Sequence, residues 1–277
     1  MIDDFNTLVL SGGGVKGLAM LGSLQYLIHD SKLKNLRKYI GTSIGAIICV
    51  LLIIGYDPKD IIVRFIHHQY LPNLPGYDFY NGIQGKGFLS YKVFEKILAD
   101  VIENKLGKIP TFGELYDLFG KELYIVTFNY TEKEEVILSH ETSSSMSILT
   151  GLRMSSNVPF VFENFNYQGD FYFDGFITNN FPINLVNFET DIVIGINALQ
   201  ETWIQDEGLQ LLSGWKIFWN LFILPFYEIQ ILRNKAYEKK CKVINIPLQD
   251  FSFLNFHLSS REILDLYSIG YRSLKTT

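Results

Sequence analysis

The fold of this chain is decided by residues 8–17, which read LVLSGGGVKG, and by residues 39–46, which read YIGTSIGA. Each stretch is a short apolar run, then a glycine turn, then the start of a segment with helical character. Two such units in succession predict parallel strands joined by right-handed crossovers. We therefore expect a three-layer α/β/α fold with a mainly parallel central sheet, in a single domain that spans residues 1–277.

Ser43 stands at the centre of the pattern Gly-x-Ser-x-Gly, between Gly41 and Gly45. An apolar strand precedes it and an apolar helix follows it, as in a nucleophile elbow, where a sharp strand-to-helix turn exposes a serine hydroxyl. Glycine on both sides permits a strained backbone and leaves room for a substrate. The pattern alone also fits an ordinary turn serine, but its place between a strand and a helix favours a nucleophile.

The glycine run at residues 12–14 presents successive backbone N–H groups without side chains, so it can hold a phosphate or a developing oxyanion. A dinucleotide-binding turn fits the run too, but an acidic residue should then end the second strand, where residues 41–43 read GTS. A Walker-type loop fails because Lys16 lacks a Ser or Thr directly after it. We interpret the run as the oxyanion hole for Ser43.

The composition limits the classes of function. The 277 residues are 48% hydrophobic, which is enough for one large core, and 24 basic against 29 acidic residues give a net charge of −5. That balance does not favour nucleic acid as a partner. Two cysteines, Cys49 and Cys241, and the lack of a secretory pattern favour free thiols and a cytoplasmic location. Residues 39–56 approach the length of a membrane span, but their glycines favour a buried strand and a buried helix.

A serine nucleophile needs a base, and the sequence offers two kinds. In the chain order of α/β-hydrolases, an acid such as Asp174 would be followed by His257. Alternatively, Asp174 is itself the base, because desolvation raises the pKa of an aspartate above its usual value of about 3.9. An ordinary turn at Asp174-Gly175 fits the same residues, and the residues alone do not separate these readings.

Four motifs follow one another along the chain. They are Gly12-Gly13-Gly14-Val15-Lys16-Gly17, Gly41-Thr42-Ser43-Ile44-Gly45, Ser155-Ser156-Asn157-Val158-Pro159 and Asp174-Gly175. The combination resembles the patatin-like phospholipase family, which has Gly or Ala after its Asp-Gly, where this chain has Phe176. The resemblance covers residues 7–196, and the C-terminal part is expected to complete the sheet and the helical layer.

The resemblance implies a serine lipid acyl hydrolase, of phospholipase A or lysophospholipase type, that needs neither calcium nor a cofactor. Ser43 would attack the ester carbonyl and Asp174 would accept its proton, in a dyad without histidine. Backbone N–H groups of residues 12–17 would hold the oxyanion, with the charge of Lys16 close by. No spacing typical of metal ligands occurs in the sequence, so no metal is expected. The resemblance further assigns the elbow glycines Gly41 and Gly45 and the acid-motif residues Gly175 and Phe176.

Two other functions stay open. One is an α/β-hydrolase-type esterase that uses His257 as its base. The other is a catalytically idle lipid-binding or scaffold protein, which the departure at Phe176 keeps open.

A lipid ester substrate also requires an apolar route and a membrane surface. Trp215, Phe218, Trp219 and Phe222 recur at helical spacing, and Pro225 is expected to kink or stop that helix. The basic residues that follow suit an anionic interface. We expect peripheral membrane contact through these four aromatic residues, although a core helix fits the same pattern. The sequence leaves the oligomeric state and the head-group preference undetermined.

Overall fold

The computed structural model describes residues 4–68, 90–198, 214–237, 240–246, 248 and 258–275, with the backbone alone for residues 65, 67, 68 and 214–220. Its strands are β1 (Thr7–Leu10), β2 (Lys38–Thr42), β3 (Glu122–Asn129), β4 (Glu134–Leu138), β5 (Phe165–Tyr167), β6 (Asp170–Asp174), β7 (Val193–Asn197) and β8 (Lys242–Asn245).

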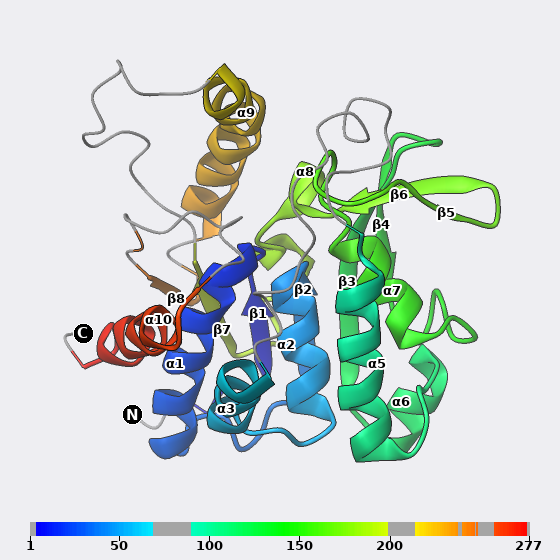
Figure 1. The fold of residues 1–277 in the computed structure, drawn as a ribbon. Coiled ribbons are helices and arrows are strands. Elements are labelled where there is room, and N and C mark those ends of the chain that lie inside the picture. The colour runs from blue at the N-terminus through cyan, green and yellow to red at the C-terminus, as the bar shows by residue number, and fades with distance from the viewer. Residues whose placement is uncertain are drawn as a thin grey trace.

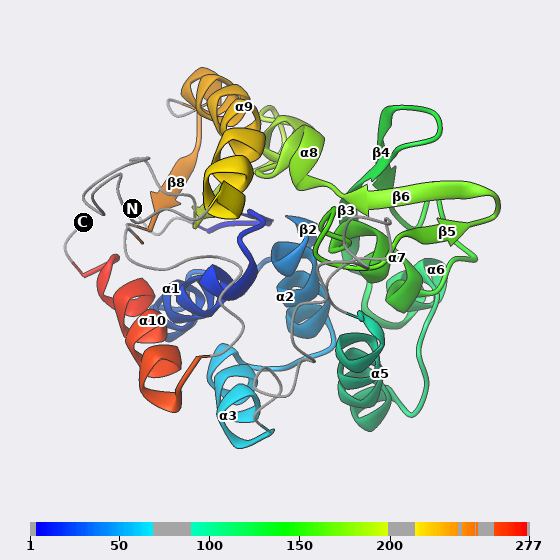
Figure 2. The same cartoon turned by 45° about the horizontal axis from the view of Figure 1, so that its top comes forward.

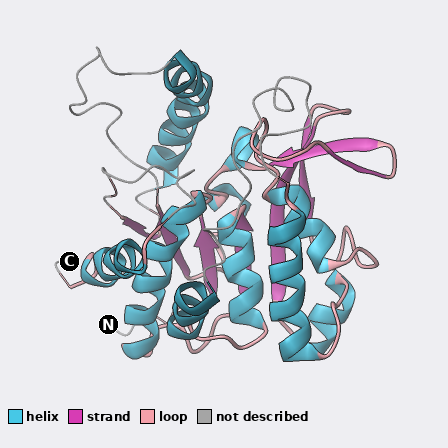
Figure 3. Ribbon diagram, in the orientation of Figure 1, coloured by secondary structure: helices cyan, strands magenta, loops and turns pink. Residues whose placement is uncertain are grey.

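These eight strands form one sheet between covering layers (Figures 1 and 3). Its order is β5-β6-β3-β2-β1-β7-β8, with β4 paired to β3 off this path. The neighbours β3, β2, β1, β7 and β8 are all parallel, whereas β4, β5 and β6 join by antiparallel pairs. The predicted α/β class with a mainly parallel central sheet is therefore confirmed.

The helices follow the strands as crossovers and covers. They are α1 (Gly17–His29), α2 (Ile44–Ile53), α3 (Pro58–His68), α5 (Lys92–Leu106), α6 (Phe112–Phe119), α7 (Ile148–Ser155), α8 (Phe176–Asn179), α9 (Gly214–Tyr237) and α10 (Ser260–Arg272), with 3₁₀ turns η1 (Gly14–Lys16) and η2 (Ile183–Leu185).

Neighbouring side chains of a strand point to opposite faces of the sheet, and the two faces pack against different cores. Leu8 and Leu10 of β1 belong to the large core shared with α1, α2, α3 and α10. Val9, between them, packs in a smaller core with the segment around η2, including Phe181 and Ile183. The sheet is thus buried on both sides, as expected for parallel strands.

Residues 39–56 form β2 and the buried helix α2, as the glycines predicted. None of the described helices is long and apolar enough to cross a membrane. Pro225 lies inside α9, which continues to Tyr237, so the alternative that proline stops this helix is wrong. Pro225 has no backbone N–H to donate to the carbonyl oxygen of Leu221. Both residues are exposed, so water can donate to that oxygen instead.

Helix α10 crosses α1 at very close range. A methyl group added at Gly270 would overlap the backbone carbonyl group of Ala19, and one at Gly22 would overlap that of Tyr267. Ser23 Oγ also donates a hydrogen bond to the carbonyl oxygen of Gly270 at 2.8 Å. This crossing ties the C-terminal helix to the helix that leaves the first glycine turn.

We predict that Gly270→Ala lowers the free energy of unfolding by about 1–3 kcal/mol, because the added methyl group overpacks the crossing. In an open helix the same change would stabilise the protein by roughly 0.5–1 kcal/mol. Chemical denaturation measures the difference, and Asp265→Ala on the exposed side of α10 serves as the control. An unchanged or raised stability of Gly270→Ala would contradict the close crossing.

Candidate active site

Ser43 occupies a sharp turn between β2 and α2. Its backbone angles, φ 55° and ψ −122°, are strained for a residue with a side chain. The flanking glycines are required by close approach, because a methyl group at Gly45 would lie 2.6 Å from the carbonyl oxygen of Leu10. One at Gly41 would lie 2.6 Å from the nitrogen of Ala46. The Gly-x-Ser-x-Gly pattern thus has the geometry of a nucleophile elbow.

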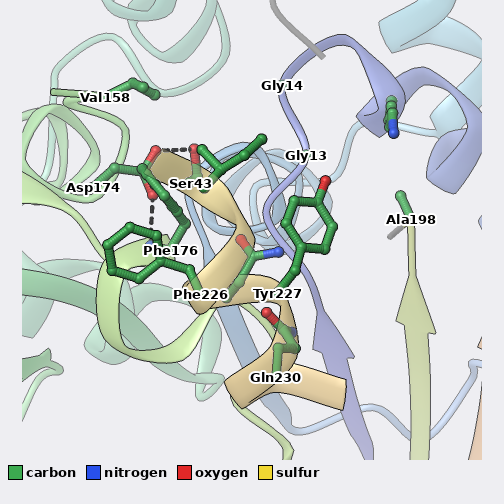
Figure 4. A pocket seen from close by; sticks show the side chains of 13 residues that line it. Gly13, Gly14, Ser43, Val158, Asp174, Phe176, Ala198, Phe226, Tyr227 and Gln230 are labelled. Carbon is green, nitrogen blue, oxygen red and sulfur yellow. Dashed lines mark hydrogen bonds between the residues drawn. The ribbon is translucent and has the colours of Figure 1, made fainter. Parts of the chain in front are cut away.

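The side chain of Asp174, at the end of β6, meets Ser43 (Figure 4). Ser43 Oγ donates a hydrogen bond to Asp174 Oδ2 at 2.6 Å, although 131 positions separate the two residues. The other carboxylate oxygen, Oδ1, accepts from the backbone N–H of Phe176 at 2.9 Å. The residue that departs from the family pattern therefore supports the carboxylate through its backbone, which its side chain does not affect.

Asp174 is only 1% exposed. Burial raises its pKa from an ordinary 3.8 to about 7, while the hydrogen bonds from Ser43 and Phe176 act in the opposite direction. A carboxyl group with a pKa near neutrality can accept a proton far better than an ordinary aspartate. The environment of Asp174 is thus suited to a general base.

The end of α7 and the loop after it hold both residues in place. Ser155 Oγ accepts a hydrogen bond from the backbone N–H of Ser43 at 2.9 Å and donates to the carbonyl oxygen of Val126 at 2.6 Å. The carbonyl oxygen of Asn157 accepts from the backbone N–H of Asp174 at 2.9 Å. In the sequence this segment is recognisable only as one of the four motifs, and no local pattern predicts the hydrogen bonds of Ser155 and Asn157.

A buried guanidinium group fixes that loop. Arg153 Nη1 donates to Asn157 Oδ1 at 2.8 Å, and the guanidinium carbon lies 4.0 Å from the ring centre of Tyr91. The hydroxyl groups of Tyr91 and Ser156 are hydrogen-bonded at 2.6 Å. Neither Arg153 nor Tyr91 could be identified from the sequence, because nothing local to them points to the site.

The first glycine turn provides fewer free N–H groups than the sequence indicated. The N–H of Gly12 donates to the carbonyl oxygen of Asn180 at 2.9 Å, and those of Lys16 and Gly17 donate within the turn. These three amides cannot stabilise an oxyanion while those bonds last. Among the described residues, the amides of the turn that have no acceptor are Gly13, Gly14 and Val15.

Two cavities lined by described residues meet at Ser43, Gly14 and Val158. One is an apolar pocket between α1, α2, α3 and α5. The other is a cleft under α9, which is also lined by Gly13, Lys16, Asp174 and Gln230. A molecule that reacts at Ser43 therefore has an apolar space on one side and a more polar space on the other. The apolar pocket is lined by Leu21, Ile47, Leu51, Ile61 and Phe94, among others.

Lys16 is buried in the wall of the cleft, with 2% of its surface exposed. Burial lowers the pKa of its ammonium group from 10.5 to about 8. Among the described residues no carboxylate pairs with it. The positive charge expected near the oxyanion is thus inside the site.

Other predicted residues lie elsewhere or outside the described part. Phe222 packs inward, 5.6 Å from the ring of Phe160 and 5.4 Å from that of Phe226. The side chains of Trp215, Phe218 and Trp219, and the whole of His257, lie outside the described residues. No group of three or more His, Cys, Asp and Glu side chains that could hold a metal ion occurs in the described part of the chain.

Comparison with known proteins identifies the family. Residues 8–186 match the family model of patatin-like phospholipases. "Probable lipid hydrolase 463L" of Invertebrate iridescent virus 6 is 32% identical over 231 residues, which cover 79% of this chain and 77% of that protein. The uncharacterized protein YqhO of Bacillus subtilis is 26% identical, over 95% of this chain and 94% of that protein. The chain belongs to the patatin-like phospholipase family.

Solved structures agree with this fold. VipD from Legionella pneumophila has a TM-score of 0.61 at 18% identity, over 99% of this chain and 66% of that chain. ExoU from Pseudomonas aeruginosa, in complex with SpcU, has a TM-score of 0.52 at 15% identity, over 99% of this chain and 52% of that chain. The chain thus spans just under two-thirds of VipD and about half of ExoU.

The raised pKa of Asp174 predicts a pH profile. A carboxyl group with a pKa of about 7 is protonated below that pH, so if Asp174 is the base for Ser43, kcat/KM should rise about tenfold per pH unit and level off above pH 7. Steady-state hydrolysis of a soluble ester between pH 5 and 8 measures this. Activity that stays level down to pH 5 would show that Asp174 has an ordinary pKa or is not the base.

Proposed function

We propose that this member of the patatin-like phospholipase family hydrolyses acyl esters of lipids with Ser43 as the nucleophile and Asp174 as the base. Lipid ester hydrolysis follows from family membership, and the roles of the residues are our proposal. The observation that carries it is the 2.6 Å hydrogen bond from Ser43 to Asp174 at the junction of the apolar pocket and the cleft.

The first half of the reaction forms an acyl-enzyme. Ser43 Oγ attacks the carbonyl carbon of the ester and its proton passes to Asp174. The N–H groups of Gly13 and Gly14, which have no acceptor among the described residues, stabilise the negative oxygen of the tetrahedral intermediate. When the intermediate collapses, the bond to the alcohol breaks and the alcohol leaves with the proton held by Asp174.

The second half regenerates the enzyme. Asp174 takes a proton from a water molecule, which attacks the acyl carbonyl carbon on Ser43. Collapse of the second intermediate releases the fatty acid, and the proton returns from Asp174 to Ser43 Oγ. Neither half requires calcium, because Asp174 carries the proton and backbone amides stabilise the oxyanion.

The shape of the site supports a lipid substrate. The apolar pocket extends from Ser43 between α1, α2 and α3 toward Leu51 and Ile61 and can bury an acyl chain. Burial of each CH₂ group contributes roughly 0.8 kcal/mol, so a long chain gains much of its binding energy there. The alcohol side of the ester then lies in the cleft under α9.

We place the membrane contact on the outer face of α9. That helix lies beside α8 at one end of the molecule (Figures 1 and 2). Residues of its inner face line the cleft. Leu221 and Leu232 are 64% and 67% exposed on the outer face, and Ile229 is 47% exposed. Exposed basic residues near its C-terminal end favour an anionic lipid surface over a neutral one. These basic residues are Arg233, Lys235, Lys240 and Lys242.

We predict that Ser43→Ala and Asp174→Asn each lower lipid ester hydrolysis by at least about 10³-fold, since each removes one member of a unit that acts together. A panel of phospholipids, lysophospholipids and acylglycerols, assayed for released fatty acid, measures this. Asparagine keeps the size of Asp174 and can still accept from Phe176, so the fold should survive.

Two controls separate this mechanism from the alternatives. His257→Ala should keep most of the activity, and so should wild type in EDTA. Because the folded protein raises the pKa of Asp174, its ionised form is unfavourable at pH 8, so Asp174→Asn should unfold no more easily there than wild type. Full activity in either dyad variant, or loss with His257→Ala alone, would refute the proposed dyad.

The membrane contact predicts a loss of binding when charge is placed on α9. The double variant Leu232→Glu and Ile229→Glu should sediment with anionic phosphatidylserine vesicles at least about tenfold less than wild type, because burying two carboxylates opposes docking. Leu118→Glu is the matched control, since Leu118 is 59% exposed on α6 at the other end of the molecule (Figure 1). Equal binding of all three proteins would rule out this face.

A further inference from the structure

Two buried residues that line the cleft under α9 carry hydrogen-bond donors with no partner among the described residues. Gln230, on the inner face of α9, is 6% exposed, and its Nε2 donates to no acceptor among the described residues. Lys16 lines the same cleft from the other side, on η1, and its ammonium group contacts no acceptor in the part of the chain that the structure describes. Both residues line the cavity that contains Ser43.

Such an arrangement is unfavourable in the free protein. Burial of a charged or polar group without a partner costs free energy, and the great majority of buried donors in proteins are satisfied. Two elements far apart in the sequence each place such a donor in one cavity. A ligand group that carries acceptors and negative charge would satisfy both donors together.

Among its described lining residues, the cleft has no carboxylate that is free to pair with these donors. Its carboxylate, Asp174, already accepts from Ser43 and from the N–H of Phe176. Much of the remaining wall is apolar or aromatic, from residues such as Ile223, Phe226 and Ala198. The cleft therefore combines an apolar wall with two donors, which suits an anionic group attached to a lipid alcohol.

We infer that Lys16 and Gln230 bind a phosphate group on the alcohol side of the scissile ester, and that Gln230 is a specificity-determining residue. This rests on the proposed function, in which the acyl chain fills the pocket on the other side of Ser43. The enzyme would then prefer esters of a phosphorylated glycerol over the matching neutral acylglycerols.

The position of Gln230 depends on how α9 is held. The ring of Phe226, one helical turn earlier, packs edge-on against Phe176 with 5.5 Å between ring centres. Arg233 Nη1 donates to the carbonyl oxygen of Thr178 at 2.6 Å. Contacts on both sides of Gln230 thus fix α9 against α8 and direct the inner face toward the cleft.

A structural role for Gln230 is the competing explanation. Gln230 also borders a small crevice between α8 and α9, where Thr178 Oγ1 and Asn234 Oδ1 are buried and have no partner in the part of the chain that the structure describes. A single bound water could satisfy all three atoms. In that case Gln230 would contribute equally to every substrate.

The test compares two soluble substrates with the same acyl chain, 1-octanoylglycerol 3-phosphate and 1-octanoylglycerol, below their micelle concentrations. We expect wild type to prefer the phosphate by at least about tenfold in kcat/KM, and Gln230→Leu to lower this ratio about tenfold, since a hydrogen bond to a charged group is lost. Gln230→Glu should lower the ratio further, because its carboxylate repels phosphate. Glu228→Gln, on the exposed side of α9, is the control and should keep the wild-type ratio.

Gln230→Leu removes an unpaired amide and should fold, which thermal melting verifies. An unchanged ratio, or an equal loss on both substrates, overturns the inference while the proposed function stands. Wild type that hydrolyses neither ester overturns the proposed function and this inference together. Inorganic phosphate is the second probe: inhibition at low millimolar concentration without any preference between the esters would mark a site for free anions and overturn the assignment to the substrate.

Discussion

The hydrogen bond between Ser43 Oγ and Asp174 Oδ2 is the interaction on which the account of this protein depends. It joins the end of β2 to the end of β6, which lie in different parts of the sheet with β3 between them. Hydrogen bonds to Ser155 and Asn157 hold the backbones of both residues. The bond between Ser43 and Asp174 is shielded from water because Asp174 is buried, and the same burial raises the pKa of the carboxyl group. The burial of Asp174 and the hydrogen bonds to its backbone thus set both the geometry and the basicity of the proposed dyad.

Helix α9 links the site to the surface. Its inner face brings Phe226 and Gln230 over the cleft, and its outer face exposes Leu221 and Leu232. A helix apolar on both faces, at the end of the molecule where the site lies, is unusual for a purely structural element. Docking to a lipid surface through one face would bring lipid close to the cleft that the other face covers.

Features of the site that depend on residues adjacent in sequence could be predicted, whereas those that depend on distant contacts could not. The elbow at Ser43 and the glycine turn at residues 12–17 are set by neighbouring residues, so their patterns predict them, and the structure has both. Arg153 and Gln230 carry no local pattern, and their places result only from long-range packing. Likewise, the N–H of Gly12 is occupied by the carbonyl oxygen of Asn180, a contact that no spacing indicates. Helix α9 continues past Pro225 because water can reach the carbonyl group of Leu221, and that exposure cannot be inferred from the residue types alone.

Covalent labelling with a fluorophosphonate, followed by peptide mapping, tests the proposed dyad of Ser43 and Asp174 most directly. A Ser–Asp dyad predicts one adduct, on Ser43, which forms at least about 10²-fold more slowly in Asp174→Asn because the base that activates the hydroxyl group is gone. Labelling at another residue, or labelling of Ser43 at an undiminished rate in Asp174→Asn, would contradict the proposed Ser–Asp dyad.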